Sequence, residues 1–476
     1  MTHIMNMKKH IIALACLTVA IGACKDSTSV PDLNNPSVSS VGGALNPGNL
    51  QILLTGALNQ ERQALDFPFY VFPATMARDV WRLDNSESRF LTETLEVAPS
   101  PGGFLARGFS TYYTAIKAEN NLLDAVPNAT ADFSAGDKAA ITGFVRTLKA
   151  NDFYRLLETR DTLGLPVAVQ DPNVLAPILC KPKVLDYLAA LLDSAYTDLQ
   201  AAQAGGTTTF PAKLPAGWTA IGGDYSQISN MIKYNRGLKG KVSLYRGLAG
   251  GPASSYTDAI AALDIALAGD PGTTASLAQG PYYQFSTLSG EVANPLFDSR
   301  IHFVPSVFDS LQAGDLRASK IITQATAATL TADGVAFSTR YDPAVTVTSN
   351  SANQTRPIPI LKNEELYLLR AQAKIENNDL LGAAADANVV RTVSGGLTPT
   401  VFTSKADAIN KILYEKRYSL LTDGGQRLAD LRAYGRLNAT SFPPGQSSPF
   451  AGDPFNYALP YQQAEIDARK GDIKCQ

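Results

Sequence analysis

Long segments with apolar residues at helical spacing, grouped in pairs, constrain the fold of this chain more than any other feature. In one of them, Phe109, Tyr112 and Ile116 fall on a single helical face. The segments predicted to be helices are Phe109–Ala125, Lys138–Leu157, Pro182–Ala202, Ser229–Leu248, Tyr256–Ala268, Asn363–Asn377, Leu380–Val393 and Lys405–Leu421. Several are joined by short loops, which predicts antiparallel helical hairpins.

Small residues occur where such helices would touch. They are Gly240 in one hairpin, and Ala371, Ala373, Ala384, Ala385 and Ala387 in another. Small side chains let antiparallel helices approach closely and stack, as in tetratricopeptide-like repeats. The full repeat consensus is absent, so these residues alone leave open both degenerate repeats and an irregular helical domain.

Long insertions separate the helical units. Residues 207–224 and 269–317 are rich in Gly, Pro, Ser and aromatic residues, and residues 331–360 alternate Thr and Val in a way that predicts short strands. Long ordered loops are more often functional than filler. The predicted fold class is therefore mainly α: a tetratricopeptide-like helical-hairpin scaffold with long loop insertions and a few short β-strands.

The N-terminus has the features of a processing segment. A basic cluster at residues 8–10 precedes an uncharged apolar run, residues 11–21, which is shorter than the about 20 residues that span a bilayer. Ile21-Gly22-Ala23-Cys24 resembles a lipobox, which predicts a lipoprotein signal peptide at residues 1–23 and acylation (palmitate) of Cys24. An ordinary secretory signal or an uncleaved anchor is the alternative.

The sequence after Cys24 predicts a tether. Ser, Pro and Asn are frequent up to Pro47, a composition typical of a flexible linker at residues 24–47. Lys25-Asp26 loosely resembles the signal that sends some lipoproteins to the cell surface. We expect the remaining residues, 48–476, to form a single domain with no second membrane-spanning segment.

Charge and rare residues narrow the function. The formal net charge is −2 with no basic stripe, which argues against nucleic-acid binding. His302 is the only histidine beyond the predicted signal peptide. A metal site built from several histidines is therefore disfavoured, and so is a Ser-His-Asp catalytic triad. We expect no metal and no cofactor. An exported context permits a disulfide between Cys180 and Cys475, and metal binding by these cysteines is less favoured.

Motifs in the C-terminal part carry a resemblance to a known family. They are Glu364–Ala373 (EELYLLRAQA), Ile412–Leu420 (ILYEKRYSL) and Gly424–Gly435 (GGQRLADLRAYG), supported by Tyr113–Asn121 and by Arg146–Tyr154 with Gly164-Leu165-Pro166. Together they resemble the SusD/RagB family from about residue 45 to the end. Ser419, Gly424 and Tyr434 depart from the family pattern, which has an acid, an acid and a Trp there.

The charged residues of this signature also have a physical interpretation. Glu415, Arg417, Arg427, Asp430 and Arg432 are opposite charges at near-helical spacing. We expect them to form hydrogen-bonded ion pairs that fix the C-terminal turns, and not to contact a ligand.

The resemblance implies a function. SusD-like proteins are surface lipoproteins, not enzymes, that bind a nutrient, typically an oligosaccharide, and lid a SusC-like TonB-dependent transporter. The resemblance also implies an outer-membrane, lipid-anchored location that faces the cell surface. Alternatives are a binding lipoprotein for peptide or another nutrient, a helical adaptor without a small ligand, and a surface glycoside hydrolase. A hydrolase needs two carboxylates about 5–10 Å apart, for which Asp79 and Asp84 are candidates.

Sugar binding needs flat aromatic faces beside polar groups. Trp81 is flanked by Asp79, Arg82 and Asn85, so this segment is the first predicted ligand-binding site. Trp218 lies in a Gly/Pro-rich loop, and Tyr282 and Tyr283 form a further aromatic cluster. The alternative is that these aromatic residues pack in the core or in loops.

Overall fold

A computed structural model describes residues 43–65, 69–171, 173–443 and 449–476 of the chain. Its larger helices are α2 (Pro47–Gln63), α5 (Phe109–Ala125), α6 (Ala135–Arg160), α7 (Lys181–Ala204), α9 (Ile228–Leu248), α10 (Ser254–Ala266), α13 (Asn363–Glu376), α14 (Leu380–Val393), α15 (Lys405–Ser419) and α16 (Gln426–Ala433). All eight predicted helices are among them, and their ends differ from the predicted ones by at most three residues.

Short helices occupy the connections. They are α3 (Val71–Met76), α4 (Arg89–Leu95), α8 (Ala216–Thr219), α11 (Thr274–Leu277), α12 (Pro305–Asp309) and α17 (Gln463–Ala468). The 3-10 turns are η1 (Phe104–Ala106), η2 (Val126–Asn128), η3 (Asp161–Leu163), η4 (Leu316–Lys320), η5 (Ala344–Thr346) and η6 (Ser351–Thr355).

Side-chain caps set where several helices begin. At α6, the Ser134 hydroxyl accepts the N–H of Asp137 at 3.0 Å, and the Asp137 carboxylate accepts the N–H of Ser134 at 3.0 Å. At α14, Asp379 accepts the N–H of Gly382 at 2.8 Å. These bonds satisfy N–H groups that lack partners within the first turn of a helix.

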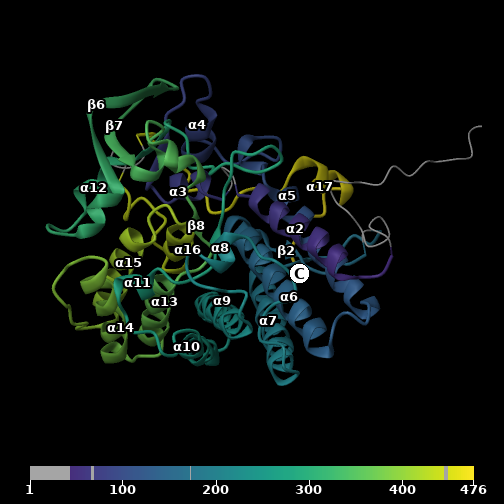
Figure 1. Cartoon of the computed structure of the whole chain (residues 1–476). Coiled ribbons are helices and arrows are strands. Elements are labelled where there is room, and N and C mark those ends of the chain that lie inside the picture. Colours follow the sequence, from purple (N-terminus) through teal and green to yellow (C-terminus); the bar gives the residue numbers. More distant parts are fainter. Residues whose placement is uncertain (1–42, 66–68, 172, 444–448) are drawn as a thin grey trace, which may run out of the picture.

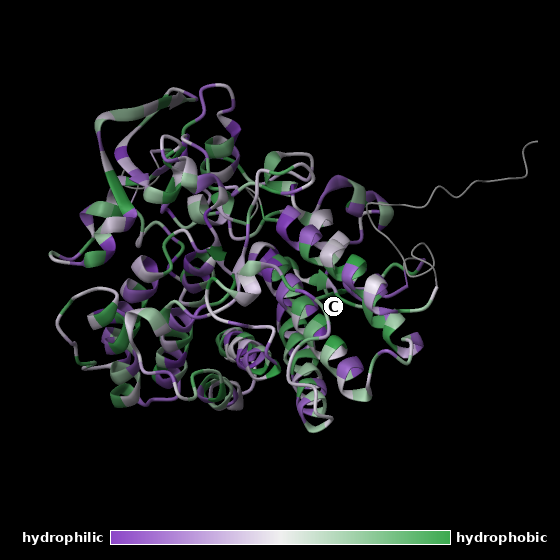
Figure 2. Ribbon diagram, viewed as in Figure 1, coloured by the Kyte–Doolittle hydropathy of each residue, from purple (hydrophilic) through white to green (hydrophobic). Residues whose placement is uncertain are grey.

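The helices stack in chain order. Helix α5 packs on α6, α6 on α7, α7 on α9, α9 on α10, α10 on α13, and α13 on α14 (Figure 1). Figure 2 shows apolar and polar residues alternating around these helices, as expected where one face of each is buried. The predicted tetratricopeptide-like scaffold of helical hairpins is confirmed as the fold.

Glycines make the closest helix contacts possible. A Cβ at Gly143 of α6 would lie 2.8 Å from the Ala195 carbonyl of α7. A Cβ at Gly240 of α9 would lie 2.4 Å from Leu263 Cγ of α10. Both distances are shorter than van der Waals contact, so these helices reach their observed separation because no side chain is present.

The strands form two-stranded antiparallel sheets. They are β1 (Val80–Arg82) with β5 (Ile301–Phe303), β2 (Leu165–Pro166) with β3 (Ile178–Leu179), β4 (Tyr282–Tyr283) with β8 (Ile358–Pro359), and β6 (Ile321–Ala332) with β7 (Val335–Pro343). The β6–β7 hairpin turns at Asp333-Gly334, where both residues have positive φ. Strands were predicted only after residue 331, but β6 begins at Ile321. The prediction missed its first part because half of the side chains of β6 are exposed and the strand shows no regular buried alternation.

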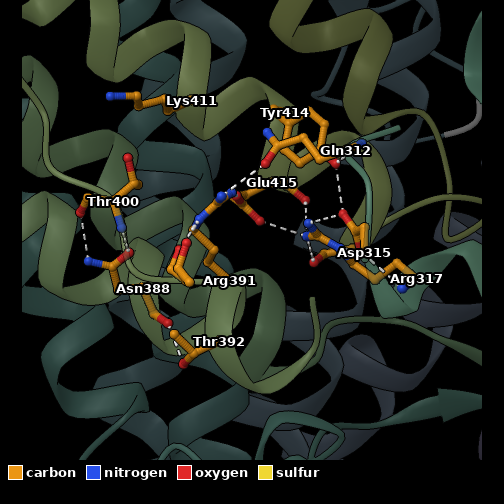
Figure 3. Close-up of polar contacts among 12 residues, drawn as sticks. Gln312, Asp315, Arg317, Asn388, Arg391, Thr392, Thr400, Lys411, Tyr414 and Glu415 are labelled. Atoms are coloured by element: carbon orange, nitrogen blue, oxygen red, sulfur yellow. Dashed lines mark hydrogen bonds and ion pairs between the residues drawn. The ribbon is translucent and has the colours of Figure 1, made fainter. Parts of the chain in front are cut away.

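Four of the five charged residues singled out in the C-terminal signature form ion pairs, but their partners lie outside that set. Glu415 contacts Arg317 at 2.8 Å and Arg391 at 2.7 Å, which ties α15 to α14 and to η4 (Figure 3). Asp430 contacts Lys416 at 2.7 Å.

Other signature residues reach distant parts of the chain. Arg417 and Arg427 lie 2.7 and 3.0 Å from the carboxylate of Asp79, so α15 and α16 are joined to the segment before β1. Arg432 donates to the backbone carbonyl of Glu158 at 2.6 Å. The signature therefore holds the C-terminal helices against the N-terminal half.

Both ends of the described chain are tied to the helical array. A disulfide joins Cys180, at the start of α7, to Cys475, with a Cα–Cα distance of 4.8 Å. At the other end, Leu45 pairs with Ala129 and Asn46 caps α2, so the last residues of the predicted tether belong to the folded part. Residues 1–23, Cys24 and most of the tether lie outside the described residues.

None of the helices in the described ranges combines the length and apolar character needed to cross a bilayer.

Candidate functional site

The first predicted site, around Trp81, is largely buried. Trp81 is 4% exposed, and its ring meets Phe337 edge to face at 5.2 Å. Arg82 pairs with Asp84 at 2.6 Å and with Asp298 at 3.0 Å. Asn85 is exposed beside them. The structure thus brings these predicted residues together, but the indole at their centre is part of the buried core.

The carboxylates proposed for the hydrolase alternative are also engaged. Asp79 is buried against Arg417 and Arg427. Burial alone would raise the pKa of Asp84, but hydrogen bonds from Ser86 and the charge of Arg82 outweigh it and lower the pKa. A carboxylate held ionised in this way is poorly suited to donate a proton as a general acid.

Trp218 and Tyr283 are buried as well. Trp218 is 2% exposed and packs edge to face between Phe144 and Tyr234. The Tyr283 hydroxyl donates to Glu61 Oε1 at 3.2 Å inside the core. Stacking on a sugar needs an open ring face, so this burial counts against Trp81, Trp218 and Tyr283. Their assignment as ligand contacts stays an untested prediction.

Tyr282 is the predicted aromatic residue that lies at a cavity. Successive side chains of a strand point to opposite faces, so Tyr282 of β4 faces outward where Tyr283 faces the core. Its hydroxyl donates to the Ala278 carbonyl at 2.7 Å. The ring lies close to Gly222, where a Cβ would come within 2.5 Å of Tyr282 Cε2. These contacts fix the orientation of a half-exposed ring.

We define the Tyr282 pocket as the cavity beside this ring, with a volume of about 390 Å³. Its lining residues are Tyr282, Leu296, Ser319, Lys320, Ala344, Val345, Arg356, Pro357, Ile358, Pro359, Lys362, Leu421, Thr422 and Asp423. They come from the insertions, from η4, from the segment before α13 and from the turn that follows α15. The β4–β8 pairing places Tyr282 opposite Pro359 and so assembles one wall from segments distant in the chain.

Charged side chains line the opposite wall. Lys362, the residue before α13, lies 2.7 Å from Asp423 and 2.9 Å from Glu364. Lys320 donates to the carbonyls of Tyr418 and Ser419 at 3.1 and 2.6 Å, at the C-terminal end of α15.

The two lysines differ in their proton affinity. Burial would lower the pKa of Lys362, but Asp423 and Glu364 outweigh it and raise the pKa. Burial and the neighbouring charge of Lys362 lower the pKa of Lys320 to about 8. Asp423 and Glu364 therefore offset less of the effect of burial at Lys320 than at Lys362.

The turn that carries Asp423 is strained. Thr422 has a φ of 72°, an uncommon conformation for a β-branched residue, and Gly424 has a φ of 136°. Such a conformation costs on the order of 1–3 kcal/mol and persists where the surroundings hold it. Here the Asp423–Lys362 pair holds the turn at the pocket wall.

Other cavities are less suited to a polar ligand. One of about 50 Å³ lies among core side chains and holds at most a few waters. A groove of about 340 Å³ beside α5 and one of about 360 Å³ beside α2 contain the ion pairs Arg469–Glu465 and Arg62–Glu291. Within the described ranges, no group of three or more His, Cys, Asp or Glu residues is placed to hold a metal ion.

The sequence analysis singled out Tyr282 but not the charged residues of the opposite wall. Lys320, Arg356, Lys362 and Asp423 lie apart in the chain and belong to no shared motif. The only local indication is that Asp423 lies between two motifs of the family signature, just after the end of α15. Only the folded chain brings the four together.

Comparison with solved structures identifies the fold. The structure resembles a SusD-like carbohydrate binding protein from Bacteroides vulgatus ATCC 8482, at 16% identity and a TM-score of 0.60, over 91% of this chain and 98% of that one. It resembles NanU of B. fragilis at 14% identity and a TM-score of 0.63, over 94% and 98%. It resembles surface glycan-binding protein A from Bacteroides uniformis at 14% and 0.63, over 90% and 98%.

No family model and no curated protein matches the sequence. The structural likeness extends over nearly the whole of each chain, so the protein has the SusD-like fold. The resemblance to the SusD/RagB family that the sequence motifs predict is confirmed at the level of the fold.

Proposed function

We propose that this protein is a SusD/RagB-family lipoprotein of the outer membrane that binds a glycan without cleaving it. It captures an oligosaccharide at the Tyr282 pocket and passes it to a SusC-like TonB-dependent transporter. The protein is anchored through Cys24 on the cell surface and lids the transporter. The SusD-like fold supports this assignment, as do three structural neighbours, two of which are described as carbohydrate-binding or glycan-binding proteins.

The Tyr282 pocket is the single observation that carries the proposal. It combines a half-exposed aromatic ring with charged hydrogen-bonding groups in a hollow of about 390 Å³, within the 300–1,000 Å³ range of ligand pockets. The ring offers an apolar face to the C–H side of a pyranose, and the polar wall offers partners to its hydroxyls. The buried or paired state of Asp79 and Asp84 favours binding over hydrolysis.

The helical array supports the role of a lid. Its hairpins expose apolar side chains such as Leu381, at 86%, and Ile265 on the side of α14 and α10. The lipobox-like segment before Cys24 supports membrane anchorage, and the sequence from there to Leu45 provides a linker between anchor and fold.

Tyr282→Ala tests the site. We expect glycan affinity to fall by about 1–3 kcal/mol, or roughly 5- to 150-fold, because one stacking face is lost. Binding is measured by titration calorimetry on the glycan that a glycan array selects. Tyr457→Ala, which removes an exposed tyrosine outside the pocket, is the matched control and should keep full affinity. Equal affinity of Tyr282→Ala and the wild type contradicts the site assignment.

Two further measurements test the class of function. Incubation with the bound glycan should release no shorter product, and released oligosaccharide would contradict a pure binding role. Affinity capture from membranes of the source cells should recover a TonB-dependent barrel. Recovery of the protein without such a barrel would argue against the transporter partnership.

A further inference from the structure

The charges around the Tyr282 pocket do not balance. Its lining holds three cationic side chains, Lys320, Arg356 and Lys362, and Asp423 as the single carboxylate. Asp423 and the neighbouring Glu364 both pair with Lys362. The acidic groups near the pocket are therefore committed to one lysine.

Arg356 is free for a ligand. The residue is exposed on the loop that leads into β8, and only its backbone is bonded, with its carbonyl accepting from Asn294 at 2.7 Å. Its guanidinium has no partner in the part of the chain that the structure describes. A guanidinium is a planar donor that binds a carboxylate or sulfate through two parallel hydrogen bonds.

Lys320 has one donor to spare. An ammonium group has three N–H donors, and two of those of Lys320 reach the carbonyls of Tyr418 and Ser419. Burial and the charge of Lys362 lower the pKa of Lys320, and Asp423 and Glu364 offset this only in part. Lys320 forms no ion pair with an acidic residue of the described chain. An anion in the pocket would supply the missing opposite charge.

We propose that the glycan bound at the Tyr282 pocket carries an anionic group, a carboxylate or a sulfate, that contacts Lys320 and Arg356. This inference rests on the proposed glycan-binding function and narrows its ligand to acidic glycans. The Tyr282 ring stacks on the sugar, and Lys320 and Arg356 favour a sugar that carries a negative charge. A neutral sugar would leave both cations without an anionic partner, which lowers its affinity relative to an acidic sugar.

The test uses matched pairs of oligosaccharides that differ only in charge. Oligogalacturonate is compared with its methyl ester, a sulfated carrageenan oligosaccharide with its desulfated form, and sialyllactose with its sialyl methyl ester, all by titration calorimetry on the wild-type protein. For every pair that binds, we expect the neutral member to bind at least 10-fold more weakly. The pair that responds distinguishes carboxylate from sulfate recognition.

Variants locate the effect at the pocket. Arg356→Gln should weaken binding of the acidic member at least 10-fold with little change for the neutral member, and it breaks no contact within the protein. Lys320→Met should act in the same direction. Lys183→Gln, which removes an exposed cation on α7 away from the pocket, is the matched control and should bind as the wild type does.

The outcomes separate this inference from the proposed function. Equal binding of neutral and acidic members, or unchanged acidic binding in both pocket variants, overturns the anionic preference and leaves glycan capture standing. Absence of binding to any glycan, charged or neutral, overturns glycan capture itself.

Discussion

At the scale of residues, Tyr282 and Tyr283 show how neighbours in the chain take opposite roles. Both were predicted as ligand contacts on composition, yet the alternation of strand β4 sends one ring to the pocket and the other into the core. The same limit applies to Trp81 and Trp218, which are surrounded in sequence by polar or turn-forming residues but are buried. Burial depends on which segments cover a residue, and local composition does not carry that information.

The core also contains carboxyl groups that sequence did not indicate. Glu61 of α2 is buried, and its Oε1 accepts from Asn151 at 3.0 Å and from Tyr283 at 3.2 Å. Burial raises the pKa of Glu61 to about 7, against an ordinary 4.5. Burial, followed by the nearby carboxylates, also raises the pKa of Asp152. These groups prefer to be protonated in the folded protein.

This preference predicts a pH-dependent stability. Because the folded pKa of Glu61 is raised, its contribution to stability is complete below about pH 4.5 and is lost as the pH rises to about 7. Glu61→Gln mimics the protonated form and should remove that loss. Relative to wild type, the variant should gain roughly 2–3 kcal/mol in unfolding free energy between pH 4.5 and pH 8.

Chemical denaturation at the two pH values measures this difference. Asp258→Asn, an exposed carboxylate on α10, is the control and should follow the wild-type dependence. A Glu61→Gln variant with the same pH dependence as wild type would show that Glu61 titrates normally in the folded protein.

At the scale of elements, helix packing depends on a few glycines. Gly143 lets α6 approach α7 so closely that an added Cβ would lie 2.8 Å from both the Ala195 carbonyl and Leu199 Cγ. Gly56 of α2, by contrast, has open space at its Cβ position. The two glycines look alike in the sequence, and only their neighbours across the interface distinguish them.

Alanine at these two positions should therefore have opposite effects. Gly143→Ala should lower the unfolding free energy by about 1–3 kcal/mol, because backbone and side chain of α7 must move. Gly56→Ala should raise it by about 0.4–1 kcal/mol, because alanine favours a helix more than glycine does. Urea denaturation of both variants measures the pair. A gain in stability at both positions would contradict the close α6–α7 contact.

At the scale of the whole molecule, long-range links close the fold. The C-terminal segment joins the start of α7 through the Cys180–Cys475 disulfide, with a sequence separation of 295 residues. The same region forms backbone hydrogen bonds from Cys180 to Gln476 and from Gln476 to Ile178. Together with the Asp79–Arg417 pair, these links join the C-terminal part of the chain to its N-terminal half.

Removal of the disulfide should destabilise the protein. The double variant Cys180→Ser, Cys475→Ser should lose about 2–4 kcal/mol of unfolding free energy, because a cross-link over a long loop restricts the unfolded chain. Thermal unfolding with and without a reductant measures the effect. The wild type should shift on reduction and the double variant should not. Identical melting of oxidised and reduced wild type would show that the disulfide contributes nothing to stability.

Much of the fold could be predicted because helix periodicity is local. The bounds of α5 and α14 follow directly from apolar spacing and from capping residues such as Asp379. Helix α2 and the short α3 and α4 were not predicted, and β6 was predicted to begin too late. Exposed strands such as β6 lack the buried alternation that marks a half-buried strand, so their sequence carries a weak signal.

The sequence by itself determined the helical hairpins, the charged C-terminal signature and, through both, the resemblance to SusD-like proteins. Each of these features depends on a stretch of one or two helices, in which residues close in the sequence are also close in space. The pocket was decided by tertiary structure alone. Tyr282, Lys320, Arg356 and Asp423 come from four separate segments, and their proximity depends on the β4–β8 pairing and on the packing of α13 and α15. A charge or a ring becomes a binding group only when other parts of the chain leave its face open, and that depends on contacts which no local pattern encodes.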